Sequence, residues 1–426
     1  MLAAIISMYK VTHSMLGMAV ISAVVGVRQG SPTSCFLFIL YVNVLIRNIK
    51  IKSAPDSFLG WLHVLMLMDD TVIFASSRDR LMEKLSILDE YCESHGMLMN
   101  EKKTEFMVIN GKPDDCRPIK LRTITMKLCT KYMYLGSIFT ADGSTISSVL
   151  AHASDKKKQL NKLLIFLARN RDMPFVVKRK VVESAFNYSI LYGAECWLKA
   201  NLQAMNTIYM SAIKALLSVR HSIPTKICLA EAGMPPLESL VRKKQHSFFN
   251  KMIGERDGMN DDPLMYALKL TEVENTELSL YIDNVKNRYS EADDMNKLYR
   301  TIRESDRTRF RTYRTLNPGM SIHKVYARDK AKDFIPEHFR IAFTRMRTSS
   351  HRLRVETGRW SGLLREDRIC KCGEAVGDEC HALTACKLTQ HLRDEYGSDV
   401  SYPDILVNAA DYRTFEFIYK VVKVFE

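Results

Sequence analysis

Two adjacent carboxylates, Asp69 and Asp70, interrupt an apolar stretch that runs from His63 to Ala75. The flanking residues alternate or are apolar, which predicts two short strands with the aspartates at the tip of a buried hairpin. An unpaired carboxylate there would be costly, so we expect a cation beside it. Magnesium prefers oxygen ligands, and two such ions can stabilise the attacking and leaving oxygens of phosphoryl transfer. The alternative is an ordinary solvent-exposed turn, because Asp favours turns.

A loop suited to bind an anion lies upstream of these aspartates. Arg28, Gln29 and Gly30 precede a Ser-Pro pair that is well placed to begin an apolar helix over 35–46. The start of such a helix presents free backbone N–H groups, and Arg28 and Gln29 can hydrogen-bond a phosphate, a sugar or a base edge. A Gly/Pro turn before a core helix is the alternative interpretation.

Two further segments follow the aspartates. Apolar residues at helical spacing over 81–92 predict a helix that Gly96 ends. A turn that contains Asn100 and Lys103 then precedes another strand, and a later apolar segment ends in Tyr134-Leu-Gly-Ser. Taken alone, Lys103 is more typical of a solvated surface charge.

In this order, Arg-Gln-Gly-Ser-Pro, the Asp-Asp hairpin, Gly-x-x-x-Asn-x-x-Lys-Thr and Tyr-Leu-Gly-Ser resemble the second half of the palm of reverse transcriptases. The segments are most similar to those of non-LTR, LINE-like retrotransposons, over about residues 17 to 140. The resemblance implies template-directed nucleotidyl transfer in which Asp69 binds Mg²⁺ and Asp70 is its neighbour. It further implies that Gln29 and Gly30 line the nucleotide pocket beside Arg28, and that Lys103 stabilises the pyrophosphate leaving group or donates a proton to it.

The sequence departs from this family in two ways. Leu67 and Met68 stand before the aspartates, where an aromatic residue and an alanine are usual. The other metal-binding aspartate of the family lies several dozen residues before the Gln-Gly motif, and residues 1–28 contain no Asp or Glu. We therefore expect little or no polymerisation by this polypeptide alone. The alternative is a catalytically dead retroelement relic that binds nucleic acid.

Composition limits the class of protein. The chain has 426 residues, of which 46% are hydrophobic, enough for two to four domains with sizeable cores. The first residues lack a basic segment typical of a signal peptide, and the longest apolar runs, such as 35–46, are shorter than a membrane span. Ten cysteines without a secretory signal favour reduced thiols. We expect a nuclear or cytoplasmic protein, neither secreted nor membrane-bound; its oligomeric state stays open.

The formal net charge of +14 favours a polyanionic partner. Residues 303–368 hold seventeen Lys/Arg against eight Asp/Glu, and residues 155–180 hold nine against two. Each block overlaps helical periodicity, as in the Leu160, Leu163 and Leu167 stripe. A solvated amphipathic surface is the alternative for any single lysine, whereas two concentrated blocks indicate a nucleic-acid track.

A cysteine-rich segment lies near the C-terminus. Cys370, Cys372, His381 and Cys386 form a Cys-x-Cys pair and a His-x₄-Cys pair, and three thiolates with one imidazole can make a tetrahedral Zn²⁺ site. Cys380 could replace one ligand or remain a free thiol, and reduced cysteines without metal are the alternative. With the arginines before it, the segment resembles the zinc-knuckle tail of the same LINE-like proteins over about residues 340 to 396.

Together these observations predict an α+β protein with a right-hand polymerase architecture. We expect a partial palm over 1–145, a helical thumb over 146–253, a helical connector over 254–330 and a basic zinc-knuckle tail over 331–426. The resemblance implies an RNA template, a DNA primer or target and dNTPs as partners, with Mg²⁺ and Zn²⁺ as cofactors.

Overall fold

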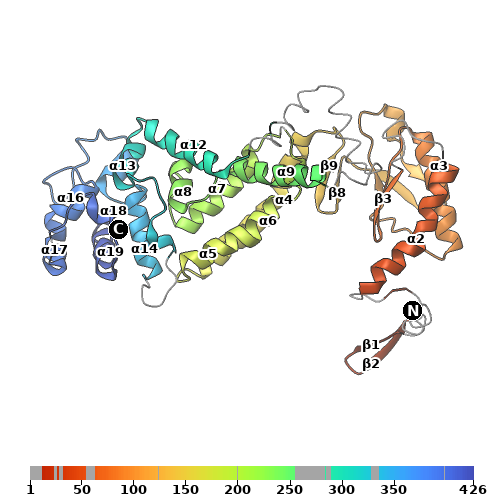
Figure 1. Ribbon diagram of the computed structural model, residues 1–426, viewed down its shortest axis with the longest axis horizontal. Coiled ribbons are helices and arrows are strands. Elements are labelled where there is room, and N and C mark those ends of the chain that lie inside the picture. The colour runs from red at the N-terminus through yellow and green to blue at the C-terminus, as the bar shows by residue number, and fades with distance from the viewer. Residues whose placement is uncertain are drawn as a thin grey trace. The chain divides into compact units, whose positions relative to one another are not determined.

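The computed structural model shows a chain whose contacts divide at residues 144 and 145 into two units (Figure 1). The residues that the structure describes are 12–23, 26–27, 32–53, 63–122, 124–198, 200–254, 284, 289–327, 335–397 and 399–426. Each unit is described below by itself.

The first unit mixes helices with short strands. Its elements are β1 (Thr12–Leu16), β2 (Ala19–Ala23), α2 (Pro32–Lys52), β3 (Val64–Leu67), β4 (Asp70–Ile73), α3 (Arg78–Ser94), β5 (Glu105–Phe106), η1 (Pro113–Cys116), β6 (Ile119–Lys120), β7 (Thr125–Leu128), β8 (Lys131–Tyr134) and β9 (Ser137–Thr140). Antiparallel hairpins are formed by β1 with β2, by β3 with β4 and by β8 with β9, and a further three-stranded sheet has the order β5-β7-β6.

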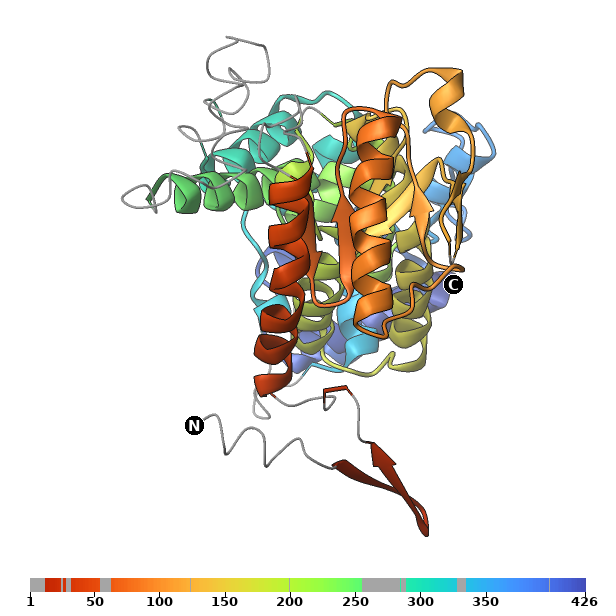
Figure 2. The same cartoon turned by 90° about the vertical axis from the view of Figure 1, so that its right-hand side faces the viewer.

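The helices α2 and α3 lie side by side, as Figure 2 shows, and hold the β3–β4 hairpin. Leu45 and Ile49 of α2 pack with Ile87 and Tyr91 of α3 in a buried cluster that Val64 and Met66 of β3 join. A second small cluster joins α3 to the three-stranded sheet. The hairpin is therefore supported by the packed helices α2 and α3.

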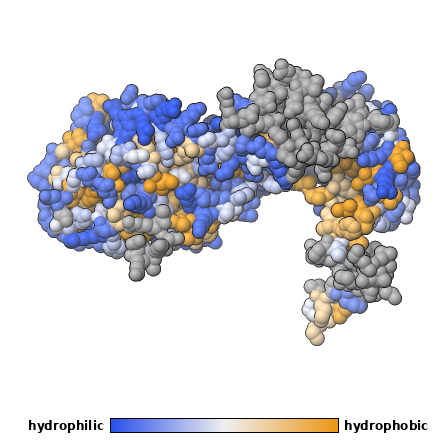
Figure 3. Space-filling model, viewed as in Figure 1, coloured by the Kyte–Doolittle hydropathy of each residue, from blue (hydrophilic) through white to orange (hydrophobic). Residues whose placement is uncertain are grey.

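Helix α2 is longer than the apolar run from which we predicted it. It extends from Pro32 to Lys52, and residues Thr33–Lys52 are long and apolar enough to cross a membrane, although only 22% of the most apolar window is buried. Its exposed hydrophobic residues include Phe36, Ile39 and Leu40, and hydrophobic residues gather on this part of the first unit in Figure 3. The core helix of a soluble protein can have the same length and composition, so α2 alone does not indicate a membrane protein.

In the residues that the structure describes, the second unit consists of helices joined by loops, with one isolated β-bridge between Ile369 and Val376. Its elements are α4 (Thr145–Arg169), α5 (Phe175–Val181), the π-helical η2 (Val182–Asn187), α6 (Tyr188–Ile190), η3 (Ala194–Cys196), α7 (Gln203–Leu217), α8 (Thr225–Ala232), α9 (Leu237–Gly254), α12 (Glu291–Glu304), α13 (Thr308–Leu316), η4 (Lys324–Ala327), α14 (Glu337–Arg347), α15 (Arg354–Trp360), α16 (Glu379–Thr384), η6 (Lys387–Thr389), α17 (Gln390–Tyr396), α18 (Asp404–Val407) and α19 (Tyr412–Phe425).

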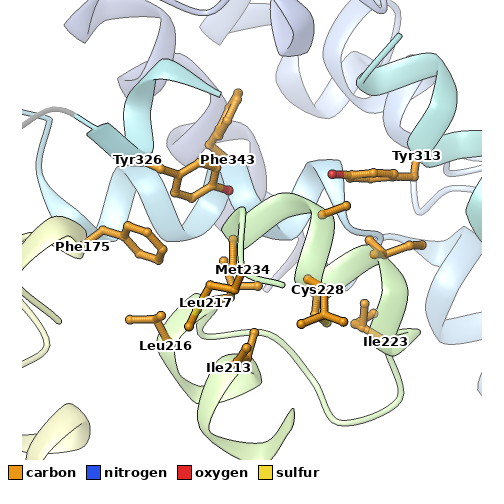
Figure 4. Close-up of a cluster of buried hydrophobic side chains, with 14 of the residues drawn as sticks. Phe175, Ile213, Leu216, Leu217, Ile223, Cys228, Met234, Tyr313, Tyr326 and Phe343 are labelled. Carbon is orange, nitrogen blue, oxygen red and sulfur yellow. The ribbon is translucent and has the colours of Figure 1, made fainter. Parts of the chain in front are cut away.

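One continuous hydrophobic core holds these helices together. Figure 4 shows a part of it, in which Leu217 of α7 and Met234, after α8, lie near Tyr326 of η4 and Phe343 of α14. The core therefore draws on the segments that we expected to be thumb, connector and tail. The limits of these domains stay a prediction.

Several predicted elements are present. The hairpin around the aspartates, the apolar helix after residue 31 and the amphipathic α4 all form. The prediction that the hairpin is buried is wrong, because every residue of β3 and β4 is partly or fully exposed and only some of them pack against the helices. Gly96 follows the end of α3 with a φ of 61°, a conformation that favours glycine. In the described residues, the mixed first unit and the helical second unit agree with the predicted α+β class. Of the helical connector predicted over 254–330, residues 255–283, 285–288 and 328–330 lie outside the described residues.

Candidate functional site

The β3–β4 hairpin presents Asp69 and Asp70 at an exposed tip. Leu67 pairs with Asp70, so Met68 and Asp69 form a two-residue loop. Met68 has a φ of 56°, which is unfavourable for a residue with a side chain. One more backbone hydrogen bond joins the residues that flank the two strands at the end opposite the turn: Phe74 N–H donates to the His63 carbonyl oxygen at 2.9 Å.

The buried Lys84 of α3 fixes the end of this hairpin. Its ammonium group donates to the Phe74 carbonyl oxygen at 2.6 Å, directly after β4. At the start of α3, the Ser77 hydroxyl caps the helix by accepting from Arg80 N–H. The two carboxylates are therefore carried by a short turn whose base is tied to a packed helix.

The surroundings of Asp70 are anionic and aromatic. Burial raises the pKa of Tyr132 and of Tyr134 on β8, and the Asp70 carboxylate raises both further, so these hydroxyls lie within its electrostatic reach. Glu105 adds to the same effect on Tyr132. Within the described residues, neither Asp69 nor Asp70 is paired with a cationic side chain. Exposed carboxylates without a cationic partner fit the hard oxygen ligands of Mg²⁺.

Lys103 lies in a turn that Asn100 organises. The Asn100 side chain accepts from Lys102 N–H at 3.1 Å. The backbone carbonyl oxygen of Asn100 accepts from Lys103 N–H and from the Thr104 hydroxyl. The Lys103 side chain is exposed and therefore open to a ligand. Its place beside the leaving group stays a prediction. The other predicted nucleotide-binding residues, Arg28, Gln29 and Gly30, lie outside the described residues.

The four predicted zinc ligands come together in the second unit. Their ligand atoms all lie within 4.8 Å of one another, with 3.6 Å between the Sγ atoms of Cys370 and Cys386 and 3.1 Å between Cys372 Sγ and His381 Nε2. A tetrahedral Zn²⁺ with bonds of about 2.3 Å to sulfur would hold its ligands about 3.8 Å apart. Cys380 is exposed, and its Sγ lies 3.9 Å from the Thr384 hydroxyl, outside this cluster.

A short loop and a helix cap position these ligands. Gly373, with a φ of 80°, donates its N–H to the Cys370 carbonyl oxygen, and the Asp378 side chain caps α16 by accepting from His381 N–H at 3.0 Å. At Gly377 a Cβ would lie 3.1 Å from Cys370 Cα, so only glycine fits without displacement.

The thiols of this cluster differ in acidity. Burial raises the pKa of Cys370 to about 12. Burial also acts to raise the pKa of Cys372, but the backbone N–H of Glu374 and the side chain of His381 outweigh it and lower this pKa to about 7. Thiolates are the form that binds zinc, so Cys372 is prepared for a metal and Cys370 would be deprotonated by one.

The second unit also contains a buried ion network, which the sequence patterns did not indicate. Glu231 of α8 accepts from Arg347 of α14 at 2.8 and 3.2 Å and from the hydroxyls of Tyr313 and Tyr326 at 2.9 and 2.6 Å. These residues are almost fully buried. The only sequence signal was an acid within the apolar helix 225–232, because the partners are more than 80 residues away.

Residues 4–139 match the family model of the reverse transcriptase (RNA-dependent DNA polymerase), which covers about one third of the chain. No curated protein matches the chain. The match contains the Asp69–Asp70 hairpin and Lys103, so the predicted metal-binding carboxylates and the predicted catalytic lysine all lie in the segment that is similar to reverse transcriptases.

Proposed function

We propose that this chain is the reverse transcriptase part of a non-LTR, LINE-like retrotransposon protein, an RNA-directed DNA polymerase. The observation that carries the proposal is the exposed Asp69–Asp70 tip within the segment that matches the reverse transcriptase family. The substrates would be an RNA template, a DNA primer or target and dNTPs. Such a protein would act in the nucleus or the cytoplasm.

In this proposal each predicted side chain has one task. The carboxylates of Asp69 and Asp70 would hold Mg²⁺, which would stabilise the charge that develops on the transferred phosphate. Arg28, Gln29 and Gly30 would hold the incoming nucleotide, and the exposed Lys103 would stabilise the leaving pyrophosphate. In the second unit, Cys370, Cys372, His381 and Cys386 would bind Zn²⁺ and shape a zinc-knuckle tail.

A second candidate function is nucleic-acid binding without polymerisation by a retroelement relic. Two observations favour it. Among the described residues, Asp69 and Asp70 belong to no group of three or more potential metal ligands, whereas two-metal catalysis needs several carboxylates around the ions. The basic exposed side chains of α4, namely Lys157, Lys158 and Lys162, need no metal to bind a phosphate backbone.

Primer extension tests both candidates. The 426-residue polypeptide is given a primed RNA template, dNTPs and Mg²⁺. The polymerase candidate predicts Mg²⁺-dependent incorporation that Asp69→Asn abolishes, whereas Asp114→Asn, a change at an exposed carboxylate of the same unit, should leave it unchanged. The relic predicts binding of the primed template without incorporation.

Each result has a separate meaning. Robust extension by the 426-residue form, lost in Asp69→Asn, would show that the carboxylate argument is wrong while the polymerase assignment is right. No extension, together with retained binding of the primed template, would refute polymerisation by this chain and leave the relic.

A further inference from the structure

Three arginines of the second unit surround one buried carboxylate. Glu356 of α15 has a side chain that is 2% exposed. Arg309 of α13 lies 2.6 Å from it, Arg359 lies 3.1 Å from it and Arg220, in the segment between α7 and α8, lies 3.7 Å from it. Residues from two helices, α13 and α15, and from one connecting segment thus place three guanidinium groups around a single negative charge.

Hydrogen-bond donors in this cluster remain without acceptors. Arg309 donates from Nη1 to the Ser222 carbonyl oxygen and from Nη2 to Glu356, while its buried Nε has no partner. Arg220 donates from Nη2 to the Ser349 carbonyl oxygen, while its buried Nε and Nη1 have none. Buried donors without acceptors are costly, and donors on charged groups are the most costly. The cluster therefore lacks oxygen acceptors.

The cluster also has an excess of positive charge. Burial lowers the pKa of Arg220, and Arg309, Arg352 and Arg345 lower it further against the opposite effect of Glu356. Burial likewise lowers the pKa of Arg359, and Arg309 acts in the same direction. Glu379, which weakly opposes the shift at Arg359, is itself held by His351 at 2.7 Å. An added anion would therefore be stabilised at this place.

An aromatic ring covers the edge of the cluster. The guanidinium carbon of Arg220 lies 4.3 Å from the ring centroid of Trp360, which is 52% exposed. A half-exposed indole that rests on a guanidinium group offers an apolar surface beside an anion-binding group. Stacking of unpaired bases on aromatic rings next to arginines is the usual way in which proteins bind single-stranded nucleic acid.

We propose that Arg220, Arg309, Arg359 and Trp360 form a subsite for single-stranded nucleic acid, in which a base stacks on Trp360 and a phosphate accepts from the arginines. The ligand class rests on the proposed function, but the subsite needs neither Mg²⁺ nor the hairpin aspartates. Unpaired rather than duplex nucleic acid fits, because a paired base has no free face for the indole. The Arg220–Trp360 contact would loosen to admit the ligand to the buried donors.

Binding of short oligonucleotides tests the subsite in the full chain. The probes are a 12-nucleotide RNA, a DNA of the same sequence and a 12-mer of abasic deoxyribose phosphate, each labelled for fluorescence anisotropy. We expect Trp360→Leu to weaken binding of both base-containing probes about tenfold, the effect of losing one stacked base, and to leave the abasic probe unchanged. Trp360→Tyr should restore most of the affinity.

Arginine variants test the phosphate half of the subsite. Arg309→Gln and Arg220→Lys should weaken all three probes, the latter because an ammonium group cannot replace the planar donor fork. Two controls are matched to these changes. Arg311→Gln removes the same charge from the exposed face of the same helix, and Tyr188→Leu removes an exposed aromatic ring of the same unit. Both controls should have a small effect.

Two results would overturn the proposal. One is unchanged affinity of Trp360→Leu for the RNA and the DNA; the other is an equal loss with the abasic probe, which would indicate an anion site of another kind. Since Trp360 is exposed, its variants should keep the melting temperature of the wild type and remain informative even where Arg309→Gln unfolds. Primer extension is measured separately, so failure of the polymerase proposal leaves this test intact.

Discussion

The two units bury their hydrophobic residues in different ways. The first unit has two small separate clusters around α3, and its longest helix leaves Phe36, Ile39 and Val44 about half exposed or more. The second unit has one continuous core to which helices from α4 to α19 contribute. A candidate site on the first unit therefore stands on short hairpins with accessible side chains, whereas the arginines and thiols of the second unit are held by extensive packing.

The charged residues discussed above also differ between the two units in their exposure to solvent. In the first unit, Asp69 and Asp70 are exposed at the hairpin tip, where a ligand can reach them. In the second, Glu231 and Arg347 are both almost fully buried and hydrogen-bonded to each other, and Glu231 also accepts from two tyrosines. Exposed charges suit transient binding of ions and substrates, and enclosed charges fix how the helices pack.

The zinc-ligand cluster should show the largest effect in this comparison. About one equivalent of Zn²⁺ should copurify with the chain. Cys372→Ser and His381→Ala should each abolish its retention, because metal binding contributes on the order of 10 kcal/mol to the folding of such sites. Cys380→Ser is the matched control and should retain the metal, since its thiol lies outside the cluster. Elemental analysis of the four proteins measures this directly.

Removal of the metal by a chelator tests the same site in a second way. Hydrogen exchange should become faster around residues 370–386 and leave the first unit unchanged. A zinc-free wild type would remove the metal site altogether. Loss of zinc in the Cys380 variant alone would show that the ligand set is wrong.

The buried ion network should show the next largest effect. Glu231→Gln removes the negative charge but keeps the shape, and leaves Arg347 buried without a counter-ion. We expect the free energy of unfolding of the second unit to fall by about 3–5 kcal/mol, the usual cost of breaking a buried ion pair. Glu304→Gln, an exposed acid of the same unit, should change it by less than about 0.5 kcal/mol. Urea denaturation measures both, and equal effects would contradict the prediction.

The same residue makes stability depend on pH. Burial acts to raise the pKa of Glu231, but Arg347 and the hydroxyls of Tyr326 and Tyr313 outweigh it and hold the pKa below its ordinary value of 4.5. A carboxyl group with a lowered folded-state pKa contributes stability that is full above about pH 4.5 and is lost as the pH falls through the folded-state value. This part of the pH dependence should disappear in Glu231→Gln.

Local sequence patterns predicted the local structure well. Alternating apolar residues gave the hairpin around Asp69, and an Asx turn explains why Asn100 precedes Lys103 at the start of a strand. The four predicted zinc ligands lie within 4.8 Å of one another because all of them fall within one segment of seventeen residues. In each case the interacting residues are close in sequence, so their spacing along the chain is enough to predict how they are arranged.

Long-range contacts were beyond such patterns. The pairing of Glu231 with Arg347 and the gathering of Arg220, Arg309 and Arg359 around Glu356 join helices that are widely separated in sequence. Arg309, Arg347 and Arg359 belong to the basic block over 303–368 that we predicted to bind nucleic acid, although Arg347 is committed to a buried ion pair. Net charge of a segment does not tell which side chains reach solvent.

The smallest expected effect concerns the strained tip of the first unit. Met68 and Leu135 are both positive-φ residues at the first position of two-residue hairpin loops, with φ values of 56° and 49°. Replacement by glycine removes a strain of about 1 kcal/mol but adds unfolded-state entropy of about 0.5–1 kcal/mol. Met68→Gly and Leu135→Gly should therefore each change the stability of the first unit by less than about 0.5 kcal/mol. Hydrogen exchange of the β3–β4 and β8–β9 amides measures the two hairpins separately. If Met68→Gly destabilises its hairpin by more than about 1 kcal/mol while Leu135→Gly does not, the half-buried Met68 side chain supports the aspartate tip by packing.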